Sequence, residues 1–216
     1  MVAQGADLNY VYADHSDLPL DVAARRGYED IVAFLLQKGA TQVRFARLGG
    51  NDAITHAAKG GYLSIVKMLL DNDPSVIDSN LGHYSTTPMY EAAKANKVDV
   101  VKYLLERGAG LKLNFTDYDF EAGYEAMEHA VQRGRNEVVR VLAKGGVDVN
   151  VVPEEMKDHD PPLFVLAMMW GQDDTAQLLL ELGATKIDLM ETKWADDFQK
   201  GVYPKSTWTL RSKRSI

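Results

Sequence analysis

The sequence predicts an all-α solenoid of stacked antiparallel helix pairs joined by turn or hairpin linkers, and three observations favour this fold class. A motif of paired small residues, a glycine and two apolar pairs recurs five times along the 216 residues. Within each copy the apolar residues fall at helical spacing. The chain has no cysteine, and 46% of its residues are hydrophobic and 25% charged, as in globular proteins. We therefore expect a folded repeat array rather than a disulfide framework or a disordered chain.

The repeated motif is clearest in the first copy, where Ala23-Ala24 precedes Gly27, Ile31-Val32 and Leu35-Leu36. The corresponding pairs of the later copies begin at Ala57, Ala92, Ala130 and Ala167, and the second residue is Val131 in the fourth copy and Met168 in the fifth. The successive spacings are therefore 34, 35, 38 and 37 residues. In the third copy Asn96 stands where the glycine is expected. The repeat unit is about 34 residues long, with small insertions in the later copies.

Each copy predicts two short helices. In the first copy the first helix covers 20–26, and its paired alanines allow neighbouring helices to approach closely. Gly27 ends this helix, because glycine readily adopts the left-handed conformation that follows a helix C-terminus. The second helix carries the apolar positions 31, 32, 35 and 36 as one stripe and stops at Gly39. A helix pair this small cannot bury its stripe alone, so neighbouring copies must share a core.

Two motifs resemble those of the ankyrin repeat. Thr87-Pro88-Met89-Tyr90 precedes an alanine pair, as in the family's helix-start motif, and the stretches 5–9 and 146–150 resemble its repeat ending. Five registered copies make the resemblance specific, and it covers about residues 5–186. It implies an ankyrin-repeat domain over 1–186, made of a partial repeat at 1–10 and full repeats at about 11–44, 45–78, 79–113, 114–151 and 152–186.

The two ends of the sequence depart from the repeat. The chain opens on a repeat ending whose helices are mostly missing, and two interpretations stay open. Residue 1 is an excision point in a longer protein, or the first complete repeat serves as its own cap. After residue 186 the pattern stops, and we expect 187–216 to form a capping helix and an extended tail. The helix, over 188–200, would pack Leu189, Trp194 and Phe198 back onto the last repeat.

The ankyrin resemblance implies a concave partner-binding face on the turns and on the exposed side of each first helix. The last first-helix positions carry a basic strip that ends in an aromatic: Arg25, Arg26, Lys59, Lys94, Arg133 and Trp170. In a chain of net charge −7, this strip favours an acidic segment of a partner. The alternative is local, since a cation near a helix C-terminus is stabilised by the helix dipole by about 0.3–1 kcal/mol.

The turns carry a second candidate set, which consists of Tyr12, His15, His83, Tyr84, Asp119 and Tyr124. Tyrosine is typical of interface hot spots because it buries a large area with few rotatable bonds and keeps a polar end. The alternative is that some of these side chains brace the longer linkers. The two sets together are the predicted partner-binding residues.

The sequence indicates a partner protein, or another domain of a longer parent chain, and no cofactor, metal, nucleic acid or membrane. The pI of 5.2 is unsuited to sequence-independent binding of nucleic acid, which needs a basic surface. The five histidines lack metal-ligand spacing, and no apolar run approaches the roughly 20 residues of a membrane span. We therefore expect an intracellular protein, cytoplasmic or nuclear, that is not an enzyme.

The alternative function is an enzyme or a small-molecule-binding protein. The linkers 115–124 and 153–162, together with the C-terminal tail, could fold over the groove and close a pocket. His159, Asp119 and Glu128 would then be the first acid or base candidates. A buried pocket of roughly 300–1,000 Å³ with converging polar groups would support this interpretation.

Overall fold

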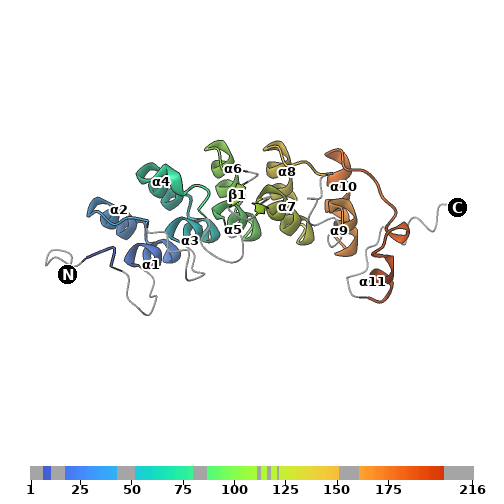
Figure 1. Cartoon of the computed structure of the whole chain (residues 1–216), viewed down its shortest axis with the longest axis horizontal. Helices are drawn as coiled ribbons and strands as arrows, with labels where there is room; N and C mark the ends of the chain where they lie inside the picture. Colours follow the sequence, from blue (N-terminus) through green and yellow to red (C-terminus); the bar gives the residue numbers. More distant parts are fainter. Residues whose placement is uncertain are drawn as a thin grey trace. The chain divides into compact units, whose positions relative to one another are not determined.

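The computed structural model describes residues 7–10, 18–42, 52–79, 87–110, 113–115, 118–120, 122–150 and 161–201. The chain divides into two compact units, Met1–Ala122 and Gly123–Ile216. In each unit the described chain forms helical hairpins, so the predicted fold class of stacked helix pairs is confirmed (Figure 1).

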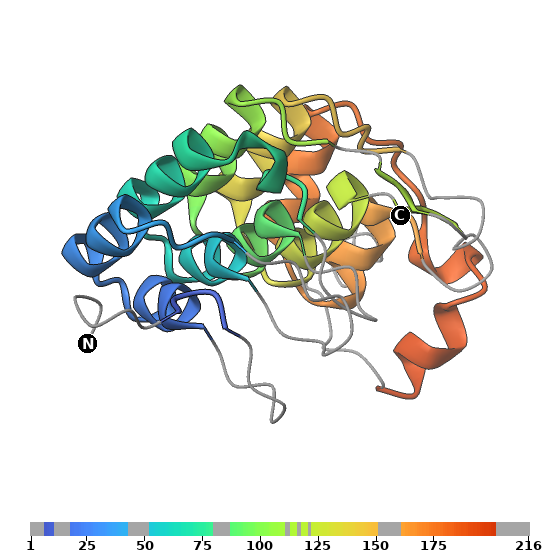
Figure 2. The ribbon, with the colours of Figure 1, turned by 60° about the vertical axis from the view of Figure 1, so that its left-hand side comes forward.

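The first unit stacks three helix pairs in two layers. The pairs are α1 (Pro19–Arg26) with α2 (Glu29–Gln37), α3 (Ala53–Gly60) with α4 (Leu63–Asn72), and α5 (Pro88–Lys94) with α6 (Val98–Glu106). One layer is formed by α1, α3 and α5, each contacting the next, and the other layer by α2, α4 and α6 (Figures 1 and 2). A 3-10 helix, η2 (Pro74–Val76), follows α4 and packs on it.

A short antiparallel hairpin follows α6 in the first unit. Its strands are β1 (Leu113–Phe115) and β2 (Tyr118–Phe120), and Asn114 lies opposite Asp119. This hairpin is one of the linkers between repeats, so it leaves the helical fold class unchanged.

The turn inside each helix pair needs a left-handed residue, as the sequence predicts. Gly27 and Gly61 have φ angles of 74° and 80°, and Asn96 takes the same conformation at 58°. Asparagine tolerates this region better than most residues with a side chain. Gly27 is also close-packed, because a Cβ atom there would lie 2.6 Å from the ring of Tyr62. The turn of one repeat therefore accepts a side chain of the next.

Side-chain caps begin the first helices of the second and third repeats. Asp52 accepts a hydrogen bond from the backbone N–H of Thr55 at 3.0 Å, and Thr87 accepts one from the N–H of Tyr90 at 3.1 Å. Such caps satisfy N–H groups that have no partner inside the helix. The buried carboxylate of Asp52 also accepts a hydrogen bond from the hydroxyl of buried Ser79. The loop after α4 is thereby tied to the start of α3.

Asparagine side chains connect the loops of successive repeats. Asn9 donates to the carbonyl of Gly39 at 3.1 Å and accepts from the N–H of Thr41 at 2.8 Å. In the second unit Asn150 makes the same pair of bonds, at 2.9 and 2.8 Å, with the loop that ends the following repeat. Both asparagines close a predicted repeat-ending motif, so this motif fixes the spacing between neighbouring loops.

The described residues of the second unit form two further helix pairs and two short helices after them. They are α7 (Ala122–Gln132) with α8 (Asn136–Lys144), α9 (Leu163–Met169) with α10 (Asp173–Glu181), η4 (Leu189–Glu191) and α11 (Ala195–Gln199). Gln172 donates to the carbonyl of Gln132 at 3.1 Å, and Thr175 donates to the side chain of Asn136 at 2.6 Å. These bonds join one helix pair to the next.

The expected single helix over 188–200 is wrong, because the segment forms two short helices. Asp188 caps η4 by accepting from the N–H of Met190 at 2.9 Å. Thr192 is extended, with φ −99° and ψ 161°, so the first helix cannot continue into α11. Leu189 is fully buried and η4 contacts α9, whereas Trp194 is only half-buried. The side chain of Phe198 lies outside the described residues.

Candidate partner-binding surface

The first helices of the first unit end in cations, as the register predicts. Arg25 and Arg26 occupy the last turn of α1 and are both exposed. Lys59 lies in the last turn of α3 and Lys94 in that of α5. Each cation faces the partial negative charge of a helix C-terminus, which favours its position there. The same placement leaves the two arginines accessible to an anionic partner.

Two cations of the strip share a buried carboxylate that the sequence analysis did not foresee. Lys59 Nζ lies 3.1 Å from one oxygen of Glu91, and Lys94 Nζ lies 3.7 Å from the other. The Glu91 side chain is only 3% exposed, whereas both lysines are partly open to solvent. Glu91 therefore links α3 to α5 and offsets part of the positive charge. The signal in the sequence was its place beside the alanine pair, in the layer where first helices contact one another.

A second group of cations lies at the end of α7 in the second unit. Arg133 is exposed, and Arg135 follows two residues later at the start of α8. Burial, and secondarily the Arg133 charge, lower the pKa of Arg135 below its ordinary value. Two cations therefore lie close enough at this turn for the charge of Arg133 to act on Arg135. Arg135 was missed by the sequence analysis, because the register pointed only to positions before the glycine.

The aromatic that ends the basic strip is exposed in part. Trp170 follows α9 as its C-cap residue and keeps 37% of its surface accessible, whereas the preceding Met169 is fully buried. A half-exposed indole offers a large apolar contact area at a repeat turn.

The prediction that Tyr124 contributes to the binding face is wrong, because this side chain is buried. The sequence predicts a linker over 115–124, but α7 begins at Ala122. Tyr124 therefore lies in the first turn of a helix of 11 residues, where it packs inward. The fourth repeat lacks the Thr-Pro start motif, so no local signal marked this earlier helix start.

The other turn residues of the candidate set are not placed by the structure. Tyr12, His15, His83 and Tyr84 lie outside the described residues, and so does His159. Asp119 lies in β2, but its side chain also falls outside the description.

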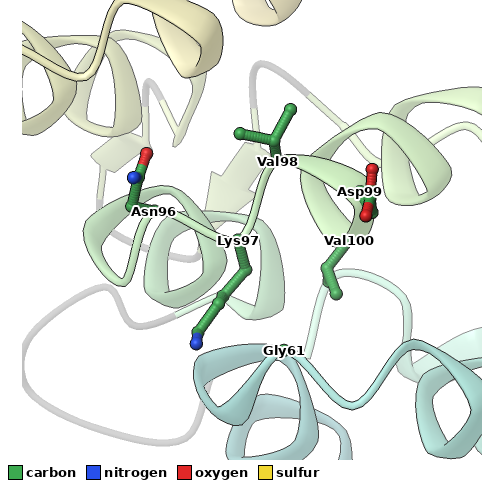
Figure 3. A pocket seen from close by; sticks show the side chains of 6 residues that line it. All are labelled: Gly61, Asn96, Lys97, Val98, Asp99 and Val100. Atoms are coloured by element: carbon green, nitrogen blue, oxygen red, sulfur yellow. The ribbon is translucent and has the colours of Figure 1, made fainter.

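A small open cleft lies where the α5–α6 turn meets the preceding repeat. Its volume is about 250 Å³, and it is lined by Gly61, Asn96, Lys97, Val98, Asp99 and Val100 (Figure 3). None of these residues comes from the linkers that were expected to close a ligand pocket. In the part of the chain that the structure describes, no three His, Asp or Glu residues gather as a metal site. No helix there is both long and apolar enough to cross a membrane.

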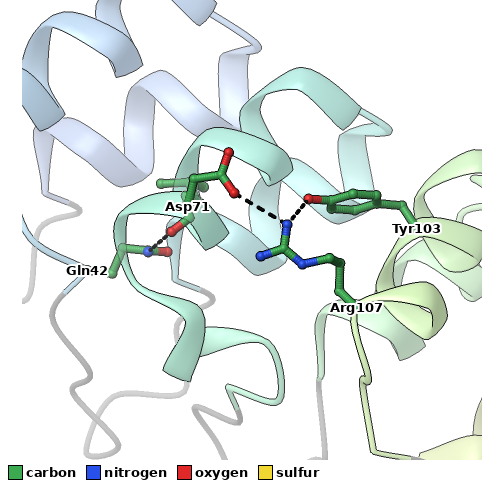
Figure 4. A network of polar contacts seen from close by, with 5 residues as sticks. Gln42, Asp71, Tyr103 and Arg107 are labelled. Carbon is green, nitrogen blue, oxygen red and sulfur yellow. Dashed lines mark hydrogen bonds and ion pairs between the residues drawn. The ribbon is translucent and has the colours of Figure 1, made fainter.

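The layer of second helices uses its charges differently. Arg107 donates to Asp71 at 3.3 Å and to the hydroxyl oxygen of Tyr103 at 2.7 Å, which joins α6 to α4 (Figure 4). Nearby, the Gln42 side chain donates to the carbonyl of Leu69 at 3.0 Å. These contacts hold one repeat against the next. This layer also carries exposed cations, Lys67 on α4 and Lys102 on α6. Because they lie outside the first helices, charge reversal there is a control for charge reversal on the first-helix ends.

Comparison with known families agrees with this architecture. Residues 16–44 match the model of the ankyrin repeat, and residues 42–117 match a model of three ankyrin repeats. The chain is an ankyrin-repeat protein. The ankyrin fold is typically a non-catalytic interaction module.

Similar proteins come from a plant and from animals. The chain is 33% identical over 135 residues to the potassium channel AKT2/3 of Arabidopsis thaliana, which covers 61% of this chain and 15% of the channel. It is 30% identical over 209 residues to the ankyrin repeat and KH domain-containing protein mask-1 of Caenorhabditis elegans, covering 84% of this chain and 8% of that protein. The chain thus spans less than a fifth of the length of these relatives.

A solved structure shows the same fold. The human ASB11 ankyrin repeat domain superposes with a TM-score of 0.60 at 24% identity, covering 77% of this chain and 70% of that one. At this identity the likeness concerns the fold alone.

Proposed function

We propose that this ankyrin-repeat chain is a recognition module that binds a partner protein on the ends of its first helices and on the turns beside them. Ankyrin repeats are generally protein–protein interaction modules. The observation that carries the proposal is the exposed pair Arg25 and Arg26 at the end of α1, in a chain of net charge −7. A local basic patch on an acidic protein steers and orients an acidic partner segment.

The buried Glu91 carboxylate changes how much each cation of the basic strip contributes to its positive charge. Lys59 and Lys94 hold this carboxylate, so part of their positive charge is offset. Arg25 with Arg26 in one unit and Arg133 with Arg135 in the other are the principal cationic contacts of the proposal. Around them, Trp170 and the turn residues Tyr12, His15, His83, Tyr84 and Asp119 supply further contacts. The partner is an intracellular protein with an acidic segment, or another domain of a longer parent chain.

The test compares two variants that change the net charge equally. The first, Arg25→Glu with Arg26→Glu, reverses the basic pair, and the second, Lys67→Glu with Lys102→Glu, reverses exposed cations of α4 and α6. Wild type and both variants are used to capture proteins from native extract. Each captured protein is then purified, and its affinity for wild type and for both variants is measured at increasing salt concentration. We expect a partner whose affinity falls as the salt concentration rises. Its affinity for the first variant should be about 10-fold or more below that for wild type, and its affinity for the second variant should be unchanged.

Circular dichroism and the melting temperature establish that both variants are folded. Equal loss with both variants would show that binding follows net charge rather than the first-helix surface. A partner that binds both variants as tightly as wild type would show that Arg25 and Arg26 do not contribute to binding.

A further inference from the structure

The first described helix pair has an open apolar face. Val22 on α1, Tyr28 in the turn, and Ile31 and Phe34 on α2 are between 36% and 53% exposed. Large apolar side chains that gather on one face are typical of interaction sites. No described helix covers this face.

The position of Ile31 is buried in the next two repeats, whereas the positions of Tyr28 and Phe34 are half-buried there. Ile65 and Val100, which correspond to Ile31 in the next two repeats, are each 1% exposed. Tyr62, which corresponds to Tyr28, lies with its ring against Gly27 of the preceding repeat. The open face around Ile31 therefore has the apolar chemistry of a repeat–repeat interface.

The surface of α2 is self-complementary about Phe34. Asp30 lies four residues before Phe34 and Lys38 four residues after it, so all three share one side of the helix. All three are exposed, and Lys38 Nζ lies 5.7 Å from the centre of the Phe34 ring. When two such helices run antiparallel about a two-fold axis at Phe34, Asp30 of each meets Lys38 of the other. The apolar centre is then closed by two opposite-charge pairs.

At the C-terminal end of the described chain, the last helix pair is covered in part. In the second unit η4 contacts α9, and Leu189 is fully buried there. A head-to-tail contact would have to displace this segment. Pairing of two identical N-terminal faces needs no displacement, and it closes at two copies.

We propose that the open face of α1 and α2 binds a second copy of this chain, with the two α2 helices antiparallel about Phe34. The occupant is the same face of the second copy. The centre of this surface, Phe34 on α2, is not one of the residues proposed to bind the partner protein, so either proposal can fail without the other.

The first experiment measures mass against concentration by sedimentation and light scattering. The mass is expected to rise from 24.0 kDa toward twice that value across micromolar to millimolar concentrations. Phe34→Glu is expected to raise the dissociation constant by about 10-fold or more, because it places a charge at the centre of the contact. Glu106→Ala, on an exposed site of α6, is the control and leaves the constant unchanged. A mass of 24.0 kDa for wild type at every concentration would overturn the proposal.

A charge-swap experiment tests the antiparallel pairing itself. Asp30→Lys alone and Lys38→Asp alone each place like charges opposite one another, so both variants are expected to dimerise more weakly than wild type. A mixture of the two variants, and the double variant, restore opposite charges and are expected to recover the dimer. Failure of both to recover, with all variants folded by circular dichroism, would contradict this geometry.

Discussion

The N-terminal and C-terminal repeats of the described chain differ in what covers their outward side. At α2, Ile31 is 47% exposed, whereas Ile65 at the same place in the next repeat is 1% exposed. At the C-terminal repeat, η4 packs on α9 and buries Leu189 completely. In a repeat protein each unit contacts only its neighbours. The burial of a repeat position is therefore decided by the neighbouring segment and not by the repeat motif itself.

The largest expected effect on stability comes from truncating the isoleucine that occupies the same repeat position in the first two repeats, Ile31 and Ile65. Ile65→Ala removes a fully buried side chain between repeats and is expected to lower the free energy of unfolding by about 2–4 kcal/mol. Ile31→Ala is expected to cost less than about 1 kcal/mol, because its side chain is already half exposed. Urea unfolding at a low protein concentration, where the chain is monomeric, measures both. Equal losses would show that another segment covers Ile31 in solution.

The next effect concerns the C-terminal side of the comparison. Leu189→Ala is expected to lower the free energy of unfolding by about 2–3 kcal/mol, because the cavity that it leaves lies against α9. Glu191→Ala, on an exposed residue of the same short helix, is the control and should stay within about 0.5 kcal/mol of wild type. Hydrogen exchange should show faster opening of α9 in the leucine variant alone. Unchanged exchange of α9 would mean that η4 does not stabilise this repeat.

The smallest expected effect comes from the residue that connects the loops of neighbouring repeats, which is an aspartate in one repeat and an asparagine in two others. Asp78 accepts from the N–H of Gly110 at 2.9 and 3.2 Å, in the place where Asn9 and Asn150 both accept and donate. An ionised carboxylate cannot donate to the carbonyl of the following loop. Asp78→Asn restores a donor and is expected to raise the free energy of unfolding by about 0.5–1.5 kcal/mol at neutral pH.

This difference should depend on pH. Burial raises the pKa of Asp78 above its ordinary value of 3.8, and the Gly110 N–H opposes the rise only in part. The folded state then binds the proton more tightly than the unfolded state, so wild type gains stability as the pH falls through the raised pKa. The advantage of the asparagine variant should shrink in that acidic range. Urea unfolding of wild type and the asparagine variant from pH 7 to pH 4 measures this change. A difference in the free energy of unfolding that stays constant over this range would show that protonation of Asp78 does not affect stability.

Much of the fold was predictable because its signals are local. The alanine pairs, the apolar stripes and the left-handed turn residues recur at a fixed spacing, and even Asn96 adopts the predicted turn conformation. The start of α7 was not predictable, because the fourth repeat lacks a helix-start motif and Tyr124 was assigned to a linker. The break before α11 depends on the extended Thr192, which helical spacing does not reveal.

Of the candidate surface, the sequence placed the cations but not their partners. Arg25, Arg26 and Arg133 lie exposed at helix ends, where the register put them. That Lys59 shares Glu91 with Lys94 depends on the approach of α3 to α5, across 32 residues of sequence. A register identifies equivalent positions, whereas an ion pair depends on the distance between two side chains of different repeats.

The repeat, its spacing and most of its helix pairs can be predicted from the sequence alone, because they follow from local periodicity and from residues suited to one backbone conformation. The tertiary structure alone decided which equivalent positions are buried, since burial requires a neighbouring surface. Ile31 and Ile65 are the same amino acid at the same register position, and only Ile65 has a described repeat packed against it.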